Sequence, residues 1–177
     1  MGKGEKRMLN NHAKLVHFFS VANRVSGRKK LQKMIYILQK CRVPFAEKFQ
    51  FHIYGPYSEE LTLRLEELCN LQLVAEEKED KGNYYRYIYE ITADGQAFLD
   101  QFALDMPDFK DQVNMLQEKS SRFLELVATM CFFDDLSREE VEEKIHVVKP
   151  KQKYTDDELA EAWTFIDTLQ QNKTNIH

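Results

Sequence analysis

Apolar residues recur at helical spacing through most of this sequence, and only three short stretches alternate with the period of two that marks a half-buried strand. The alternating stretches are 49–54, 73–77 and 84–91, and residues 78–83 between the last two have the composition of a hairpin turn. The pattern predicts a mainly helical α+β protein with a small antiparallel β-hairpin or sheet.

Hydroxyl-bearing residues stand before five of the helical runs, where their side chains can accept hydrogen bonds from the first free amides of a helix. The expected caps are Ser26, Ser58, Thr92, Ser137 and Thr155. At the last two, a carboxylate three residues later completes a capping box. A further helix is expected over residues 8–25, and residues 113–131 predict one long helix or two short ones.

The helix expected after Ser26 has an apolar face and a basic face. Its inward residues, by helical spacing, are Leu31, Met34, Ile35 and Leu38. The opposite face is then expected to expose Arg28, Lys29, Lys33 and Lys40. This helix therefore offers a basic surface, and the Gly55-Pro56 pair is expected to end the strand that follows it.

The character of the sequence changes after Pro107, where the strand patterns stop and only helical patterns remain. We expect an α+β unit over residues 8–104 that packs on a C-terminal helical subdomain over residues 105–171. The chain has 177 residues, of which 43% are hydrophobic, and this is enough to bury a continuous core.

Charge is unevenly distributed along the chain. Residues 1–48 carry a net charge of +10, with Lys3, Lys6 and Arg7 among their cations, whereas the remainder carries −14 and the whole chain −4. Such an asymmetry favours an anionic partner for the basic segment. The alternative is that the basic segment docks on acidic surface of its own chain.

The residue types that carry catalysis or metal binding do not cluster. The five histidines are scattered, the three cysteines are widely spaced, and no glycine-rich phosphate loop or nucleophile elbow is present. The sequence therefore predicts a protein that is not an enzyme and has no catalytic residues, metal site or cofactor.

The sequence also bears on the compartment. Residues 1–6 lack the apolar core of a secretory signal, and no stretch approaches the ~18–20 apolar residues of a membrane span. We therefore expect a cytoplasmic protein with no membrane partner.

Residues 58–99 combine a leucine-striped helix, a charged hairpin and the segment Tyr-Glu-Ile-Thr-Ala-Asp-Gly at 89–95. This arrangement resembles the recognition helix, wing and exit of winged helix-turn-helix proteins, which implies a winged-helix-like N-terminal unit. Here, however, the helix carries Glu59, Glu60, Glu66 and Glu67 around a single Arg64. A face of this charge is repelled by phosphates, so the resemblance does not imply major-groove reading.

Residues 30–36 (Lys-Leu-Gln-Lys-Met-Ile-Tyr), followed by Tyr-Gly-Pro-Tyr at 54–57, are similar to the signature of the Panacea domain of SocA-like antitoxins. Most of the chain, including the Cys-Phe-Phe segment at 131–133 and Trp163, resembles the YwgA family of bacterial proteins. The resemblance implies a non-enzymatic module that recognises a protein.

Two functions follow as expectations. The first is a regulatory or adaptor module for a protein partner, with contact residues Arg28, Lys29, Lys30, Lys33, Tyr36, Tyr54, Gly55, Pro56 and Tyr57. The second is a DNA-binding transcriptional regulator that uses Arg24, Arg28, Lys29, Lys33, Lys40 and Lys81. A structural alternative for the Panacea-like motif is that Leu31, Tyr36 and Gly55-Pro56 hold helix, strand and turn together.

Overall fold

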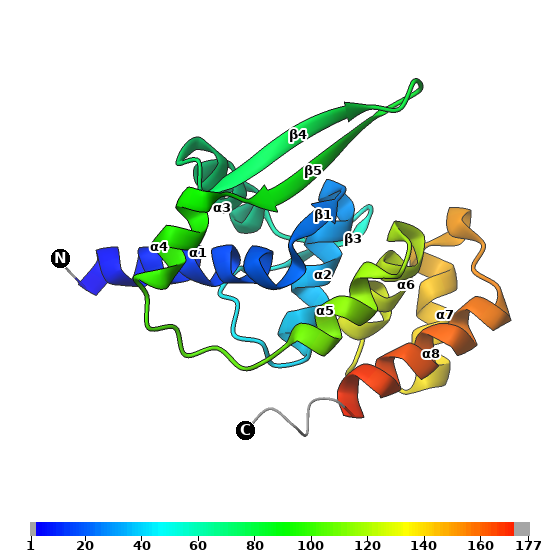
Figure 1. Cartoon of the computed structure of the whole chain (residues 1–177). Helices are drawn as coiled ribbons and strands as arrows, with labels where there is room; N and C mark the ends of the chain where they lie inside the picture. Colours follow the sequence, from blue (N-terminus) through cyan, green and yellow to red (C-terminus); the bar gives the residue numbers. More distant parts are fainter. Residues whose placement is uncertain (1–2, 172–177) are drawn as a thin grey trace.

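The computed structural model describes residues 3–171, with side chains from residue 9 onward (Figure 1). Lys3, Lys6 and Arg7 of the predicted basic segment, like the N-terminal residues used to predict the compartment, therefore lie outside the described side chains. No helix in the described part of the chain has both the length and the apolar character needed to cross a bilayer.

The N-terminal half contains four helices and all five strands of the described residues (Figure 1). In chain order these are α1 (Lys3–Ala22), β1 (Arg24–Ser26), α2 (Arg28–Lys40), β2 (Gln50–His52), β3 (Gly55–Tyr57), α3 (Glu59–Asn70), β4 (Val74–Asp80), β5 (Tyr85–Ile91) and α4 (Ala93–Asp100). The C-terminal half is helical, with α5 (Lys110–Gln117), α6 (Ser121–Phe132), α7 (Arg138–Val148), a 3-10 turn η1 (Pro150–Gln152) and α8 (Asp156–Gln171).

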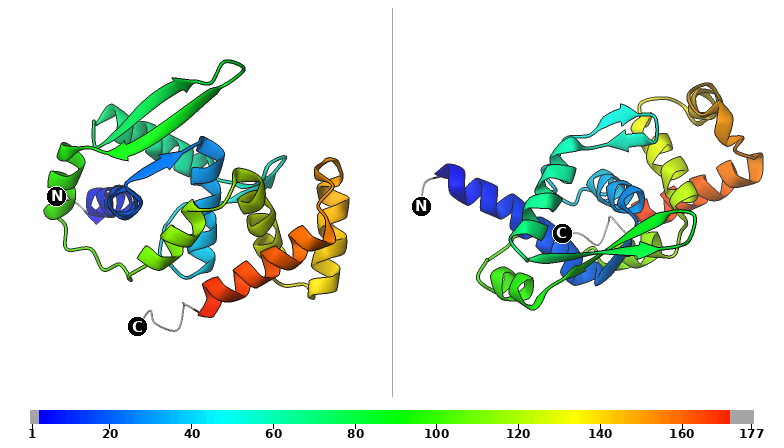
Figure 2. Two further views of the ribbon diagram at one scale, coloured as in Figure 1. Left: turned by 45° about the vertical axis from the view of Figure 1, so that its right-hand side comes forward. Right: turned by 90° about the horizontal axis from the view of Figure 1, so that it is seen from above.

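The strands form two small antiparallel sheets. In the larger sheet the order is β1-β5-β4, and Tyr89 of β5 lies opposite Val25 of β1 and Glu76 of β4. The smaller sheet is the β2–β3 hairpin, in which Phe51 lies opposite Pro56. Figure 2 shows that the far end of the β4–β5 hairpin projects beyond the helices. The predicted class, mainly helical α+β with a small antiparallel sheet, is confirmed; the winged-helix assignment stays a prediction.

Four of the five predicted helix caps are confirmed. The hydroxyls of Ser58 and Thr92 accept from backbone amides three residues on, and capping boxes form at Ser137 and Thr155. The Ser26 cap is wrong, because the N-cap of α2 is Gly27 at φ +104°, with no side-chain hydrogen bond.

The expected end of the strand at Gly55-Pro56 is only half right. Gly55 turns the chain, with φ at +86°, a value that favours glycine. The chain then returns as β3 instead of leaving the sheet. The strand β1 differs from the expectation too, since the sequence predicts that residues 24 and 25 end the first helix and that Ser26 caps the second.

Helix α2 lies at the centre of the molecule. All eight residues from Leu31 to Leu38 are buried, because α2 packs against β1, β3, α5 and α6. The expectation that Lys33 faces outward is therefore wrong, since this side chain is 1% exposed. The prediction of one buried and one exposed face did not include the packing of α6 and β3 on the second face of α2.

The C-terminal helices complete the same core. Residues 110–132 form two short helices, α5 and α6, and their buried apolar side chains join those of α1 and α2 in one cluster. The division at residues 104 and 105 stays a prediction, although one hydrophobic core crosses it.

Candidate partner-binding groove

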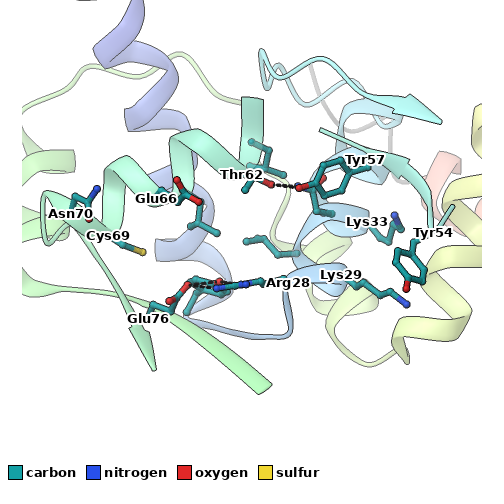
Figure 3. A pocket seen from close by; sticks show the side chains of 15 residues that line it. Arg28, Lys29, Lys33, Tyr54, Tyr57, Thr62, Glu66, Cys69, Asn70 and Glu76 are labelled. Atoms are coloured by element: carbon teal, nitrogen blue, oxygen red, sulfur yellow. Dashed lines mark hydrogen bonds and ion pairs between the residues drawn. The ribbon is translucent and has the colours of Figure 1, made fainter. Parts of the chain in front are cut away.

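A groove of about 480 Å³ lies between α2 and α3, with β3, β4 and β5 along its sides (Figure 3). Its floor is formed by Leu31 of α2 and by Leu61 and Leu65 of α3, which helical spacing places on one face of each helix and which are 1%, 1% and 8% exposed. The groove therefore offers an apolar surface between polar walls, which is typical of a site for an organic ligand or a peptide segment.

Arg28 is held firmly at the sheet side of the groove. Its guanidinium carbon lies 3.6 Å from the centre of the Tyr87 ring, and its Nε donates to the Tyr89 hydroxyl at 3.0 Å. The Tyr89 hydroxyl in turn donates to Glu76 Oε2 at 2.6 Å, and Arg28 lies 3.5 Å from the same oxygen. Burial and the Glu76 carboxylate raise the pKa of Tyr89, so this phenol stays protonated and the arrangement is fixed.

Lys29 and Tyr54 lie together at one end of the groove. The Lys29 ammonium is 3.7 Å from the centre of the Tyr54 ring, an arrangement in which the cation is attracted to the ring face. Tyr54 is 51% exposed and Ile53 beside it 82% exposed, both at the turn between β2 and β3. This end of the groove is cationic and has exposed apolar surface.

The other end of the groove carries Glu66, Cys69 and Asn70 of α3, and Figure 3 shows these side chains away from Lys29 and Tyr54. Burial raises the pKa of the Cys69 thiol to about 11, so it is not a reactive thiolate at neutral pH. The groove therefore has a cationic end at Lys29 and an anionic end at Glu66.

Two polar contacts fix the walls relative to each other. The Gln32 side-chain amide donates to the Ser58 carbonyl and accepts from the Ser58 amide, both at 2.9 Å. Tyr57 and Thr62 share a hydrogen bond of 2.8 Å between their hydroxyls. These bonds join α2, β3 and the start of α3, so the groove is already formed in the absence of a ligand.

The two halves of the Panacea-like motif meet behind the groove. The Lys33 ammonium donates to the Pro56 carbonyl at 2.6 Å. A Cβ at Gly55 would lie 3.0 Å from the Thr129 hydroxyl and 3.8 Å from Lys33 Cε, so the turn fits closely between α2 and α6. For Gly55-Pro56 these contacts support the structural alternative for the motif, and they give Lys33 a structural contact that the sequence did not predict.

Two further buried charges complete this contact, which we call the lysine clamp (Lys33, Glu125 and Lys149). The Lys149 ammonium lies 3.1 Å from Glu125 Oε1 and also donates to the Ile53 carbonyl. Glu125 and Lys149 are 4% and 6% exposed. The clamp therefore attaches both sides of the β2–β3 turn to the interior, one side through each lysine.

Burial lowers the pKa of Lys33 to about 8 from the usual 10.5, and Glu125 only partly offsets this. Between pH 8 and pH 10.5 the unfolded chain therefore binds more protons at this site than the folded one. Below pH 8, Lys33 is charged in both states, and burial of the charge lowers the free energy of unfolding in full. As the pH rises from 8 to 10.5, the folded protein loses this proton before the unfolded chain does. We therefore expect the contribution of Lys33 to the free energy of unfolding to rise by about 3 kcal/mol across this window.

This prediction is measured as the difference in the free energy of unfolding between wild type and Lys33→Met, by urea titration from pH 7.5 to 9.5. Ionisable groups far from Lys33 contribute equally to both proteins and cancel in the difference. The wild-type curve should climb relative to the variant. Parallel curves would contradict the lowered pKa.

The structure brings together five of the nine predicted contact residues: Arg28, Lys29, Lys33, Tyr54 and Tyr57 all line the groove. The remaining four lie elsewhere. Lys30 donates to the Gln117 carbonyl at 2.7 Å, Tyr36 packs on Phe49, and Gly55 and Pro56 are buried. Because Lys33 is buried too, Lys33→Glu would report on folding and not on a surface.

The residues predicted for DNA do not form one surface. Three of them form ion pairs with carboxylates of the same chain: Arg24 with Glu90 at 3.3 Å, Lys40 with Asp134 at 3.1 Å and Lys81 with Glu79 at 2.5 Å. On α3, Arg64 turns to the buried Glu47 at 2.9 Å, which leaves the exposed face to Glu59, Glu60, Glu66 and Glu67. Part of the basic segment is thus neutralised by its own chain.

Sequence reasoning missed Glu125 and Lys149. The signal for Glu125 was present, since it is the only charged residue in the apolar stretch 123–132. Lys149 gave no such signal, because the local sequence Val-Val-Lys-Pro-Lys at 147–151 does not predict a buried lysine. Among the residues described, no group of three or more His, Cys, Asp or Glu side chains could hold a metal ion.

Comparison with known proteins gives one close relative. The sequence is 55% identical over 164 residues to the uncharacterized protein YwgA of Bacillus subtilis (strain 168), which covers 93% of this chain and 99% of the relative. No protein-family model matches the sequence. An identity this high over nearly the full length of both sequences shows that the chain belongs to the YwgA family.

Proposed function

We propose that this protein is a non-enzymatic binding module that holds a segment of a partner protein in the groove between α2 and α3. The observation that carries the proposal is the groove itself: an apolar lining between two rigid walls, with a cation at one end and a carboxylate at the other. The Panacea-like signature supports the proposal, because the domains it resembles recognise proteins.

The charges of the groove define the segment that fits it. Lys29 favours an acidic side chain at the end marked by Tyr54, and Glu66 favours a basic one at the other end. Tyr57 and the exposed edge of Leu65 favour apolar side chains between them. The partner segment therefore carries an acidic residue, an apolar stretch and a basic residue in this order along the groove.

Exposed aromatic side chains at the rim are the expected energetic anchors, since Tyr and Trp dominate interface hot spots. We expect Tyr54→Ala to weaken partner binding about ten-fold, which corresponds to ~1.4 kcal/mol. Lys29→Glu should weaken it further, because it places a carboxylate opposite the acidic end of the segment. Affinity capture from native cells, quantified by mass spectrometry, measures both effects.

The matched control is Leu63→Ala. Leu63 is 59% exposed and lies on α3 outside the groove, so its loss should leave capture unchanged. Capture that is equal for wild type, Tyr54→Ala and Lys29→Glu would contradict the groove as the binding site. Loss of capture for Leu63→Ala alone would place the partner on another face of α3.

A further inference from the structure

A second cleft, of about 580 Å³, lies where the starts of α2, α6 and β5 meet. Its cationic lining residues are Arg28, Lys29, Lys30, Arg86 and Lys119, and no Asp or Glu side chain is among the described residues that line it. The whole chain has more acidic than basic residues, 29 against 25, so a lining of this kind is a local departure from the composition. We call it the basic cleft.

The positive charge of the basic cleft is only partly neutralised. Three of its cations lie 3.3 to 3.6 Å from carboxylates that are not among its lining residues: Arg28 from Glu76, Arg86 from Glu79 and Lys119 from Glu161. Lys29 and Lys30 lie within ion-pair distance of no carboxylate in the part of the chain that the structure describes. The Lys30 ammonium donates to the Gln117 carbonyl and the Lys29 ammonium lies over the Tyr54 ring, so both have partners but neither charge is neutralised by a carboxylate there.

The start of α2 adds to this positive field. Its first turn consists of Arg28, Lys29 and Lys30, with no acidic residue, and Gly27 supplies no side-chain acceptor for the free amides. Cations are unfavourable at this end of a helix, because the helix dipole is positive there. An anion in the basic cleft would offset this repulsion, and the hydroxyls of Ser120 and Ser121 line the same cleft.

Aromatic side chains make the cleft more than a site for a simple anion. Tyr84 and Tyr85 line it from the β4–β5 hairpin and are 61% and 57% exposed. The Tyr84 ring has no ring or cation contact within the described residues, whereas Lys78 covers one face of Tyr85 at 3.9 Å. Exposed rings beside a cationic groove are how proteins bind unpaired bases.

We propose that the basic cleft binds single-stranded nucleic acid, with backbone phosphates at Lys29, Lys30 and the start of α2 and a base stacked on Tyr84. A paired base inside a duplex has no free face to offer this ring. The inference is independent of the protein-binding groove, although Arg28 and Lys29 line both sites.

The test is fluorescence anisotropy with a labelled twelve-residue oligothymidylate in 50 mM salt, and with a duplex of the same length. We expect the single strand to bind more tightly than the duplex. Tyr84→Ala should raise Kd about ten-fold, and Lys30→Gln should raise Kd and reduce the slope of log K against log salt by about 0.7. The controls, Leu63→Ala and Lys151→Gln, alter an exposed apolar side chain and an exposed lysine outside the cleft and should leave Kd unchanged.

Three results would overturn the inference: no binding at 50 mM salt, equal binding by wild type and Tyr84→Ala, or a duplex that binds as well as the single strand. The test is separate from that of the proposed function. Tyr84→Ala should weaken oligonucleotide binding and leave partner capture unchanged, so failure of either proposal can be told from failure of the other.

Discussion

Replacement of Glu125 by glutamine is expected to lower the free energy of unfolding by about 3–5 kcal/mol. The substitution keeps the shape of the side chain but removes the carboxylate that lies 3.1 Å from the Lys149 ammonium. It also removes the negative charge that favours the protonated form of Lys33. Two buried ammonium groups would then share the interior with no carboxylate in the clamp, and loss of one partner from a buried charge pair is strongly destabilising.

Urea unfolding at pH 7 measures this effect, and Glu158→Gln is the matched control. Glu158 pairs with Arg122 at the surface, and a glutamine can keep its capping hydrogen bond to the Thr155 amide. The control should lower the free energy of unfolding by less than about 1 kcal/mol. If Glu125→Gln costs no more than Glu158→Gln, the lysine clamp does not hold the turn as we describe.

Gly95→Ala is expected to lower the free energy of unfolding by about 3 kcal/mol. In a helix this exchange normally stabilises by about 1 kcal/mol. Here a Cβ on Gly95 would lie 2.1 Å from the backbone oxygen of Leu73 and 3.0 Å from Ile91 Cγ1. A backbone atom cannot rotate away as a side chain can, so α4 would have to separate from the segment before β4.

Thermal or urea unfolding of Gly95→Ala beside Gln96→Ala checks this prediction. Gln96 is the next residue of α4 and is exposed, so its substitution should change the free energy of unfolding by less than about 0.5 kcal/mol. A Gly95→Ala protein more stable than wild type would mean that α4 does not lie against Leu73 in solution.

Local features of the fold could be predicted from the sequence because they depend on a few neighbouring residues. Helix starts at Ser58 and Thr92 need only a hydroxyl and an amide three residues away. The β4–β5 hairpin follows in the same way from alternation on both sides of a polar turn. Gly95 lies in the segment 89–95 that resembles winged-helix proteins, but the sequence does not predict that the backbone of Leu73 approaches it closely.

Features that depend on distant segments could not be predicted. The spacing around Lys33 predicted a solvent-facing side chain, but α6, more than 80 residues later, covers it together with the β2–β3 turn. Strand β1 is defined by its pairing with β5, which is distant in the sequence. Its three residues are too few to show an alternating pattern from which a strand could be predicted.

Part of the candidate site could be predicted, because several of its residues are placed by local structure alone. Arg28 and Lys29 start a helix, Tyr54 lies in the β2–β3 turn and Tyr57 ends β3, so each is placed by local structure. Their meeting in one groove depends on the Lys33 to Pro56 bond, which joins the two elements. Glu66, at the acidic end of the groove, was interpreted from the sequence only as part of a helix face that repels DNA.

The measurement that tests the protein-binding groove most directly is site-specific photocross-linking in native cells. A photoreactive phenylalanine at Tyr54 or at Glu66 would lie at either end of the groove, and one at Leu63 would lie outside it on α3. We predict that the same partner protein is attached from both groove positions and not from Leu63. Attachment from Leu63 alone, or no specific adduct from either groove position, would contradict the groove as the site of partner binding.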